Sequence, residues 1–309
     1  MTLLEPASLT AKAAMTPPPT TVRPAVRAAA ERLADAGVAS PDHDARALAL
    51  HVLGLRRPSD LLLVDAFDDE QLAAFDDLVG RRARREPLQH LTGTVGFRHL
   101  ELEVGPGVFV PRPETESVVQ WAIDALACEG GSAPVVADLC TGSGTIAFAL
   151  AHEVPGITVH AVERDPGALA WARRNAARRV EAGDPEVVLH HGDVADCLPG
   201  LDGALDLVIS NPPYVAEGER HLPEPEVVDH DPEIALFAGV DGLDVVRLVE
   251  RAARRLLRPG GLVVVEHSDR QGRTAPALFR DAGGWAEVAD HQDLLGRDRF
   301  VTARWEPAA

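Results

Sequence analysis

The residues best suited to chemistry are Asn211, Pro212, Pro213 and Tyr214, which directly follow the apolar run Leu205–Ser210. Such a run predicts a strand buried on both faces of a parallel sheet. The two prolines end the strand and hold Asn211 extended. A planar NH₂ group fits this corner, because Asn211 Oδ1 and a proline carbonyl can accept its two hydrogens while Tyr214 packs on its face. A plain strand-ending turn stays open as the alternative, since Asn-Pro is ordinary turn chemistry.

A second candidate site lies upstream, at Cys140, Thr141, Gly142, Ser143 and Gly144. This segment joins a predicted strand to a helix that starts near Thr145. Glycines let the backbone turn tightly and approach a ligand, and the helix N-terminus offers free N–H groups. The segment is not GxGxxG, which disfavours a dinucleotide; a simple tight turn is the alternative.

Two acids follow at the ends of the next two predicted strands. Glu163 stands where an acid can accept both hydroxyls of a ribose, and Asp193, with Val194 beside it, stands where it can reach an adenine amino group. Taken singly, each acid could equally be a helix cap or a solvated strand end. Their order, Gly-rich loop, acid, acid and then Asn-Pro-Pro-Tyr, resembles that of S-adenosylmethionine-dependent methyltransferases that act on a planar amine or amide nitrogen.

The elements that must position these residues alternate between strand and helix. Five parallel strands with crossover helices and a C-terminal hairpin predict a doubly wound α/β fold. Helices are expected to start near Thr145, Pro166, Gly242 and Gln271. The predicted strands are 134–140, 158–163, 186–191, 205–210, 262–266, 285–291 and 300–305.

The N-terminal part predicts different structures. Residues 1–21 are expected to be a disordered leader, residues 22–87 a small helical domain and residues 88–110 a β-hairpin linker. Ser40 is expected to cap a helix that begins at Pro41. Four arginines (Arg81, Arg82, Arg84, Arg85) end the last helix of this domain; they are either a nucleic-acid patch or a solvated helix end that the dipole favours.

Composition limits the function classes. The net charge is −18, and residues 91–309, with 35 acids against 19 bases, carry −16 of it, which disfavours direct binding to long nucleic acids. No apolar run is long enough for a membrane span. The three cysteines are far apart, which argues against a disulfide framework or a metal site and favours a reducing cytoplasm.

Three segments of the sequence indicate a particular family of methyltransferases. Residues 86–116, 138–150 and 210–214, including PRPETE and NPPY, together resemble the release factor glutamine methyltransferases (HemK/PrmC family). The resemblance covers nearly the whole chain from about residue 22. It implies a class I methyltransferase fold over residues 111–309, with a mostly parallel seven-stranded sheet, and a helical N-terminal domain that binds the substrate.

The resemblance also implies the reaction, N5-methylation of the glutamine in the GGQ loop of peptide-chain release factors by a cytoplasmic, monomeric enzyme. S-adenosylmethionine is expected to contact Asn211 and the residues from Cys140 to Gly144, Glu163, Asp193, Val194, Phe109 and Arg112. Asn211 to Tyr214 are expected to clamp the glutamine amide. Cys140 departs from the glycine often found in the family.

Three alternative functions remain open. N6-adenine DNA methyltransferases and the sister enzyme that methylates a ribosomal protein also use NPPY. The third alternative is a catalytically silent binding module. The acidic segment 215–241 is expected to dock a basic protein substrate by charge.

Overall fold

The computed structural model describes residues 20–130, 133–222 and 224–307. The chain divides into two compact units, residues 1–85 and 86–309. The expected leader lies outside the described residues up to position 19. Its last two positions are ordered: the Thr20 carbonyl accepts a hydrogen bond from Phe67 N (3.1 Å), and Thr21 forms an isolated bridge with Ala66.

The first unit is helical, with α1 (Val22–Asp35), α2 (Pro41–Leu53), the 3₁₀ helix η1 (Pro58–Leu63) and α3 (Asp69–Ala83). Leu33 and Leu48 are fully buried, and the rings of Phe67 and Phe75 stack with centroids 5.1 Å apart. Helix α3 begins with a capping box between Asp68 and Gln71. Ser40 precedes α2 as expected, but its side chain makes no capping hydrogen bond.

The arginines at the end of α3 are not simply solvated. Arg82 is buried, and its Nε donates to Asp44 Oδ2 at 2.7 Å, while Arg85 Nη1 donates to the Gly37 carbonyl at 3.0 Å. A buried arginine needs such a carboxylate partner because the interior cannot solvate its charge. These two side chains therefore hold α3 to the segments around α2 and the end of α1.

The second unit begins with the short helix α4 (Leu88–Thr92), followed by the antiparallel hairpin β1 (Thr94–Phe97) and β2 (Leu100–Glu103). The prediction of a hairpin from residue 88 was therefore wrong over its first turn. Leu88 and Leu91 are three residues apart, a helical spacing, and Gly93 ends the helix with φ of 78°.

The main sheet has seven strands in the order β5-β4-β3-β6-β7-β9-β8. The parallel strands are β3 (Val135–Leu139), β4 (Thr158–Glu163), β5 (Val188–His191), β6 (Leu205–Ser210) and β7 (Leu257–Glu266). The antiparallel pair β8 (Trp285–Gln292) and β9 (Asp298–Trp305) completes it. The predicted fold class is thus confirmed. Strand β7 starts five residues earlier than predicted because Leu257 already pairs with Leu205.

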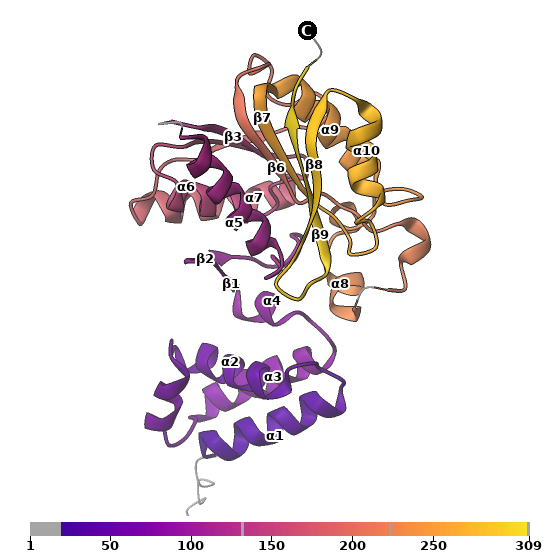
Figure 1. The fold of residues 1–309 in the computed structure, drawn as a ribbon. Coiled ribbons are helices and arrows are strands. Elements are labelled where there is room, and N and C mark those ends of the chain that lie inside the picture. The colour runs from indigo at the N-terminus through magenta and orange to yellow at the C-terminus, as the bar shows by residue number, and fades with distance from the viewer. Residues whose placement is uncertain (1–19, 131–132, 223, 308–309) are drawn as a thin grey trace, which may run out of the picture. The chain divides into compact units, whose positions relative to one another are not determined.

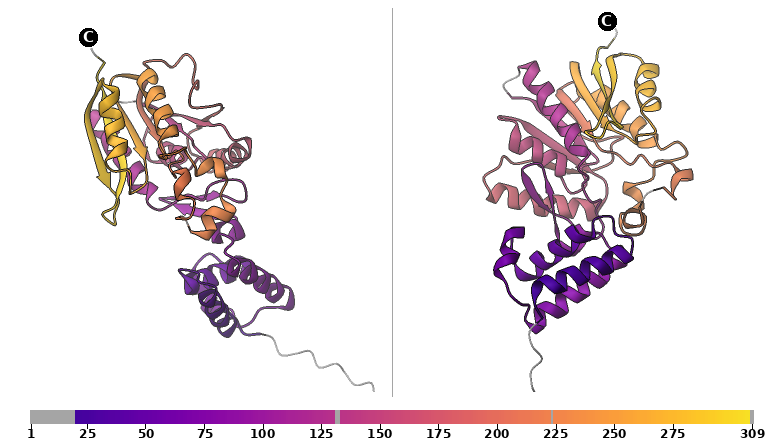
Figure 2. Two further views of the ribbon diagram at one scale, coloured as in Figure 1. Left: turned by 90° about the vertical axis from the view of Figure 1, so that its right-hand side faces the viewer. Right: turned by 60° about the horizontal axis from the view of Figure 1, so that its bottom comes forward.

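Helices cover both faces of this sheet (Figures 1 and 2). On one face lie α5 (Thr115–Glu129), α6 (Thr145–Glu153) and α7 (Pro166–Glu181); on the other lie α9 (Asp244–Leu256) and α10 (Thr274–Ala282). Each face has its own buried apolar cluster. None of the helices within the described ranges is long and apolar enough to cross a bilayer.

Between β6 and α9 the chain forms η2 (Glu217–Glu219), α8 (Pro225–His230) and η3 (Glu233–Ala235). Most acids of this segment are paired or buried: Arg220 pairs with Glu217 and Glu233, Arg270 with Glu219, Arg247 with Asp241 and Arg112 with Asp231, and Glu226 is buried. Glu224 and Asp229 are exposed. Glu217, Glu233 and Asp241 are exposed as well, so five of the segment's eight acids face solvent, and docking of a basic partner by this charge stays a prediction.

Candidate active site

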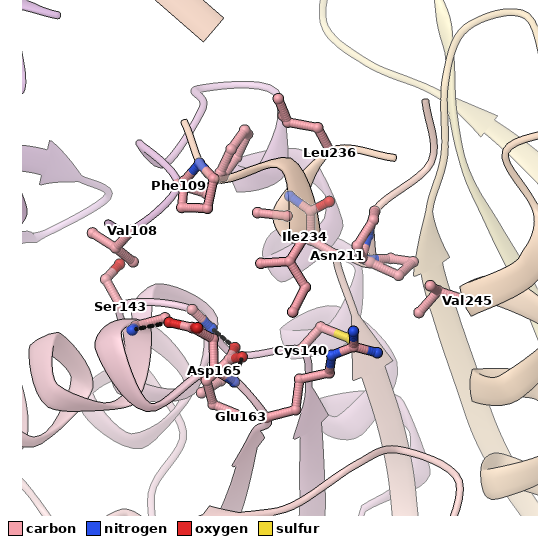
Figure 3. A pocket seen from close by; sticks show the side chains of 18 of the residues that line it. Val108, Phe109, Cys140, Ser143, Glu163, Asp165, Asn211, Ile234, Leu236 and Val245 are labelled. Carbon is pink, nitrogen blue, oxygen red and sulfur yellow. Dashed lines mark hydrogen bonds between the residues drawn. The ribbon is translucent and has the colours of Figure 1, made fainter. Parts of the chain in front are cut away.

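A cavity of about 380 Å³ opens beyond the carboxyl ends of β3, β4 and β6. Its volume lies in the range usual for small-molecule sites. It is lined by nearly all the residues predicted from the sequence: Phe109, Arg112, Cys140, Thr141, Gly142, Ser143, Glu163, Asp193, Val194, Asn211, Pro212, Pro213 and Tyr214. Figure 3 shows Phe109, Asn211 and Leu236 on one side of the cavity and Ser143, Glu163 and Asp165 on the other.

Gly144 is the one predicted site residue that does not line the cavity. It caps α6 with φ of 87°, and a Cβ there would lie 2.1 Å from the Phe148 ring. Only glycine therefore fits, and its function is to let the loop turn into the helix.

Cys140 has φ of 63°, a left-handed conformation that costs a non-glycine residue about 1–2 kcal/mol. Burial raises the pKa of its thiol, so the group is neutral at physiological pH. A cysteine thus occupies a backbone position suited to glycine, and its side chain lines the cavity.

Asp138, at the buried end of β3, holds the loop from below. Its Oδ2 accepts hydrogen bonds from Thr141 Oγ1 and from Ala147 N in α6. Its Oδ1 has no hydrogen-bond partner among the described residues. Burial raises the pKa of this carboxyl to about 7.

Glu163 ends β4 with its carboxylate against the same loop. Oε2 accepts from Gly142 N (2.9 Å) and Oε1 from Asp165 N (2.8 Å). Burial raises the pKa of this carboxyl, and the two backbone donors partly oppose that rise. Each oxygen keeps a second lone pair, so the group can still accept two hydroxyls from a ligand in the cavity.

Asp193 lies after β5 and is more open. Its Oδ1 accepts from Ala195 N (3.0 Å), which closes the turn, and its Oδ2 faces Arg164 Nη1 at 3.4 Å. The side chain remains 42% exposed, so a ligand can reach it.

Asn211 stands at the carboxyl end of β6. Its Nδ2 donates to Thr115 Oγ1 at 3.2 Å, and Oδ1 has no hydrogen-bond partner among the described residues. Ser210 Oγ donates to the Leu139 carbonyl at 2.6 Å, tying this corner to the end of β3. The amide thus leaves one acceptor for a ligand.

The backbone of Tyr214 is held rigidly. Gln271 Nε2 donates to its carbonyl at 3.1 Å, and a Cβ on Gly242 would lie 2.3 Å from that same oxygen. Its side chain is half-buried, and its hydroxyl donates to Glu266 Oε1 at 3.4 Å. Burial, reinforced by the negative charge of Glu266, raises the pKa of Tyr214, which keeps the phenol protonated.

Arg112 joins the cavity wall to α8. Its guanidinium lies 5.4 Å from the Phe109 ring centroid and 3.4 Å from Asp231 Oδ2. Asp231 is buried, and burial raises the pKa of its carboxyl to about 6. The contact holds the segment that carries Pro232 and Ile234 beside the cavity.

Several lining residues were not predicted. The apolar side chains from 227–237 that line the cavity follow no helix or strand periodicity, so the sequence gave no sign of their position. Asp165 lines the cavity too, but its sequence context is that of an ordinary helix N-cap, and its Oδ2 indeed accepts from Ala168 N. Thr115 lay inside the PRPETE stretch, whose resemblance could have identified it. Glu266 was not predicted either; it does not line the cavity, but it ends the buried strand β7 next to β6, the strand that leads to Asn211.

Two family models match the chain, the "PrmC N-terminal domain" over residues 24–93 and the "Methyltransferase small domain" over residues 106–224. The release factor glutamine methyltransferase of Streptomyces coelicolor is 54% identical over 279 residues, covering 90% of this chain and 96% of that protein. That of Mycolicibacterium smegmatis is 50% identical over 284 residues, with 92% and 98% covered. A Streptomyces pristinaespiralis methyltransferase of 4-amino-L-phenylalanine and its methylamino derivative is 44% identical, with 68% and 71% covered.

Among solved structures, the 16S rRNA N2 G1207 methyltransferase of T. thermophilus, in complex with AdoMet and guanosine, superposes with a TM-score of 0.51 at 20% identity. The match covers 69% of this chain and 50% of that one and shows a common fold. Three findings agree on a methyltransferase of this family: the strand order of the sheet, the methyltransferase family model and the high identity to relatives over nearly their full length. The chain is a methyltransferase that belongs to the release factor glutamine methyltransferase family.

Proposed function

We propose that the chain transfers a methyl group from S-adenosylmethionine to the side-chain nitrogen N5 of the glutamine in the GGQ motif of peptide-chain release factors. The observation that carries the proposal is the unpaired Oδ1 of Asn211, which lies in one cavity with the Gly-rich loop and Glu163. The family to which the chain belongs supports the choice of substrate.

The residues present fit the cofactor. Glu163 keeps lone pairs for two ribose hydroxyls, Asp193 is open to an adenine amino group, and Gly142 brings bare backbone to the cavity. When bound, S-adenosylmethionine supplies an electrophilic methyl group. Cys140 to Ser143, Val194, Phe109 and Arg112 complete the wall that would hold it.

The protein's own part in the reaction is mainly positioning. An amide nitrogen is a poor nucleophile, because its lone pair is delocalised into the carbonyl. Asn211 Oδ1 and a carbonyl of the two prolines would accept its hydrogens, fix its direction and stabilise the positive charge that develops on it. Tyr214, with its ring and backbone fixed, would hold the amide plane.

Purified chain incubated with methyl-labelled cofactor and a release factor tests the proposal, with mass spectrometry of the GGQ peptide as the readout. A methylated glutamine in the wild type, and none when that glutamine is replaced by glutamate, is the expected result. DNA, a ribosomal protein and 4-amino-L-phenylalanine are offered in parallel. The last is included because a relative at 44% identity is a methyltransferase of that amine. Transfer to one of these and not to the release factor would replace the proposed substrate.

A further inference from the structure

An asparagine lies in the interior of helix α7, a position that the helix itself does not favour. Asn175 is 1% exposed and does not line the cavity. Asparagine is a poor helix former, because its side chain competes for backbone hydrogen bonds. Burying an amide is also unfavourable unless its hydrogen bonds are made. The partners of this side chain should therefore explain why it is there.

Asn175 is bonded to two segments that are far apart in the sequence. Its Oδ1 accepts from Glu103 N at 2.7 Å and its Nδ2 donates to the Glu103 carbonyl at 3.0 Å, a pair of bonds like that between adjacent antiparallel strands. Nδ2 also donates to the Ser143 carbonyl, at 3.0 Å. The reversed amide would place its NH₂ group against the Glu103 N–H, so the direction of these bonds is fixed.

Both segments continue into the cavity wall. Ser143 belongs to the Gly-rich loop, residues 140–144, and Glu103 ends β2 and leads to Val108 and Phe109; Ser143, Val108 and Phe109 all line the cavity (Figure 3). Helix α7 therefore connects two walls of the cavity through one buried side chain.

Trp171 supports the same connection from one turn earlier on α7. Residues four apart lie on the same face of a helix, so Trp171 and Asn175 face the same segment. Trp171 Nε1 donates to the Pro106 carbonyl at 3.3 Å, and a Cβ on Gly105 would lie 2.6 Å from the indole ring. The segment that leads to Val108 thus lies closely against α7.

We propose that Asn175 is a positioning residue for the methyl donor: it ties segment 103–109 to the Gly-rich loop and so holds two walls of the cavity in place before the donor binds. Walls that are already ordered reduce the free energy that binding must spend on ordering them, which raises affinity. The inference rests on the proposed function, since it takes S-adenosylmethionine as the ligand of this cavity.

The sequence offers a direct probe, because it contains two asparagines, Asn175 and Asn211. Protein labelled with ¹⁵N in the asparagine side chains gives two pairs of NH₂ signals, which Asn211→Ala assigns. Both hydrogens of the Asn175 NH₂ group are bonded, whereas that of Asn211 makes one bond, to Thr115, within the described residues. The NH₂ group of Asn175 should therefore exchange with solvent at least about tenfold more slowly.

Saturating S-adenosylmethionine should slow the exchange of Asn175 further. The reason is that contacts which favour donor binding are stabilised by the donor in return. Exchange as fast as that of Asn211, or exchange that the donor does not change, would overturn the inference.

Calorimetry with Asn175→Ala measures the effect on donor binding. Without the amide, the arrangement with both walls in place is expected to become a minority state, and a population of about 1–10% raises the apparent Kd for S-adenosylmethionine about 10- to 100-fold. At saturating donor, kcat for a GGQ peptide should stay within about threefold of the wild type, because the bound donor restores the arrangement.

Leu256→Ala is the control for a general loss of stability. Leu256 is fully buried in the apolar cluster on the other face of the sheet, and it does not line the cavity. This variant should unfold more easily and keep the donor Kd of the wild type. An unchanged Kd in Asn175→Ala, or an equal rise in Leu256→Ala, would contradict the positioning role.

A second variant keeps the inference testable if Asn175→Ala does not fold. Gly105→Ala presses on Trp171 and should push segment 103–109 away from α7, so it should also raise the donor Kd; an unchanged Kd would count against the connection. A chain that methylates no release factor, but loses donor affinity in these variants, would refute the proposed substrate and support the role of Asn175. A chain that methylates release factor and binds the donor equally well in all forms would refute that role alone.

Discussion

Replacing Glu163 by alanine is expected to weaken binding of S-adenosylmethionine by about 1–3 kcal/mol, which is about 5- to 150-fold in Kd. The carboxylate is buried, and two backbone N–H groups hold it, at 2.9 and 2.8 Å. It is therefore pre-oriented, and its remaining lone pairs can form two charge-assisted hydrogen bonds to a ribose. Water that enters the space left by alanine replaces part of that interaction. The loss of binding free energy is therefore expected to be smaller than the sum of two full hydrogen bonds.

Isothermal titration calorimetry with wild type, Glu163→Ala and Glu163→Gln measures the effect. Glutamine keeps one acceptor oxygen but presents an NH₂ group to one of the backbone N–H groups. The Kd of Glu163→Gln for the cofactor should therefore fall between those of the wild type and Glu163→Ala. Glu250→Ala, at a buried glutamate outside the cavity, is the control and should leave Kd unchanged.

Donor binding should also depend on pH through this residue. Burial raises the pKa of Glu163, and the ionised form is the better acceptor for hydroxyls. Affinity should therefore fall as pH is lowered through this raised pKa in the wild type and stay flat in Glu163→Gln. Equal affinity of all three proteins at pH 8 would show that the ribose is held elsewhere, and the reasoning would be refuted.

Three further predictions follow from the site. Asn211→Ala should abolish methyl transfer with donor Kd within a few-fold by calorimetry; a large loss of donor affinity with turnover preserved would contradict its role. Cys140→Gly should be more stable than Cys140→Ala by about 1 kcal/mol in urea denaturation, the reverse of the usual order, because φ is 63°. The pKa of Asp138 is raised by burial from 3.8 to about 7, so its ionisation makes the wild type lose stability as pH rises through that window. The free energy of unfolding of Asp138→Asn should therefore rise relative to that of the wild type between pH 4 and 8, by at most about 4 kcal/mol. A difference in unfolding free energy that stays constant with pH would be inconsistent with that pKa.

The positions of most strands along the chain could be predicted from the sequence because most parallel strands are short apolar runs with a clear end. Thr158–Glu163 and Leu205–Ser210 were predicted with their observed bounds. The start of β7 was missed because Arg258 to Gly261 has the composition of a turn; the pairing of Leu257 with Leu205 extends the strand across it. Such pairing is a tertiary effect that local propensity does not contain.

The same limit applies to the site. Residues at strand ends, such as Glu163 and Asn211, could be placed in one cavity because carboxyl ends of parallel strands share an edge. The segment around Ile234 and Leu236 could not, since it returns to the cavity by pairing with Val215 after an irregular loop. Arg82 is another example of a contact that the local sequence does not predict. Of the four neighbouring arginines, it is the one whose Nε donates to the buried Asp44, which is 38 positions earlier in the sequence.

In the proposed reaction, the corner at Asn211 presents a glutamine amide for methylation. Its most direct test is mass spectrometry of the GGQ peptide from a release factor incubated with cofactor and either wild type or Asn211→Ala. A gain of one methyl group, assigned to the glutamine side chain by fragmentation, with wild type and none with the variant is the result we expect. An unmodified glutamine with wild-type protein that binds the cofactor, or equal methylation by both proteins, would contradict the claim.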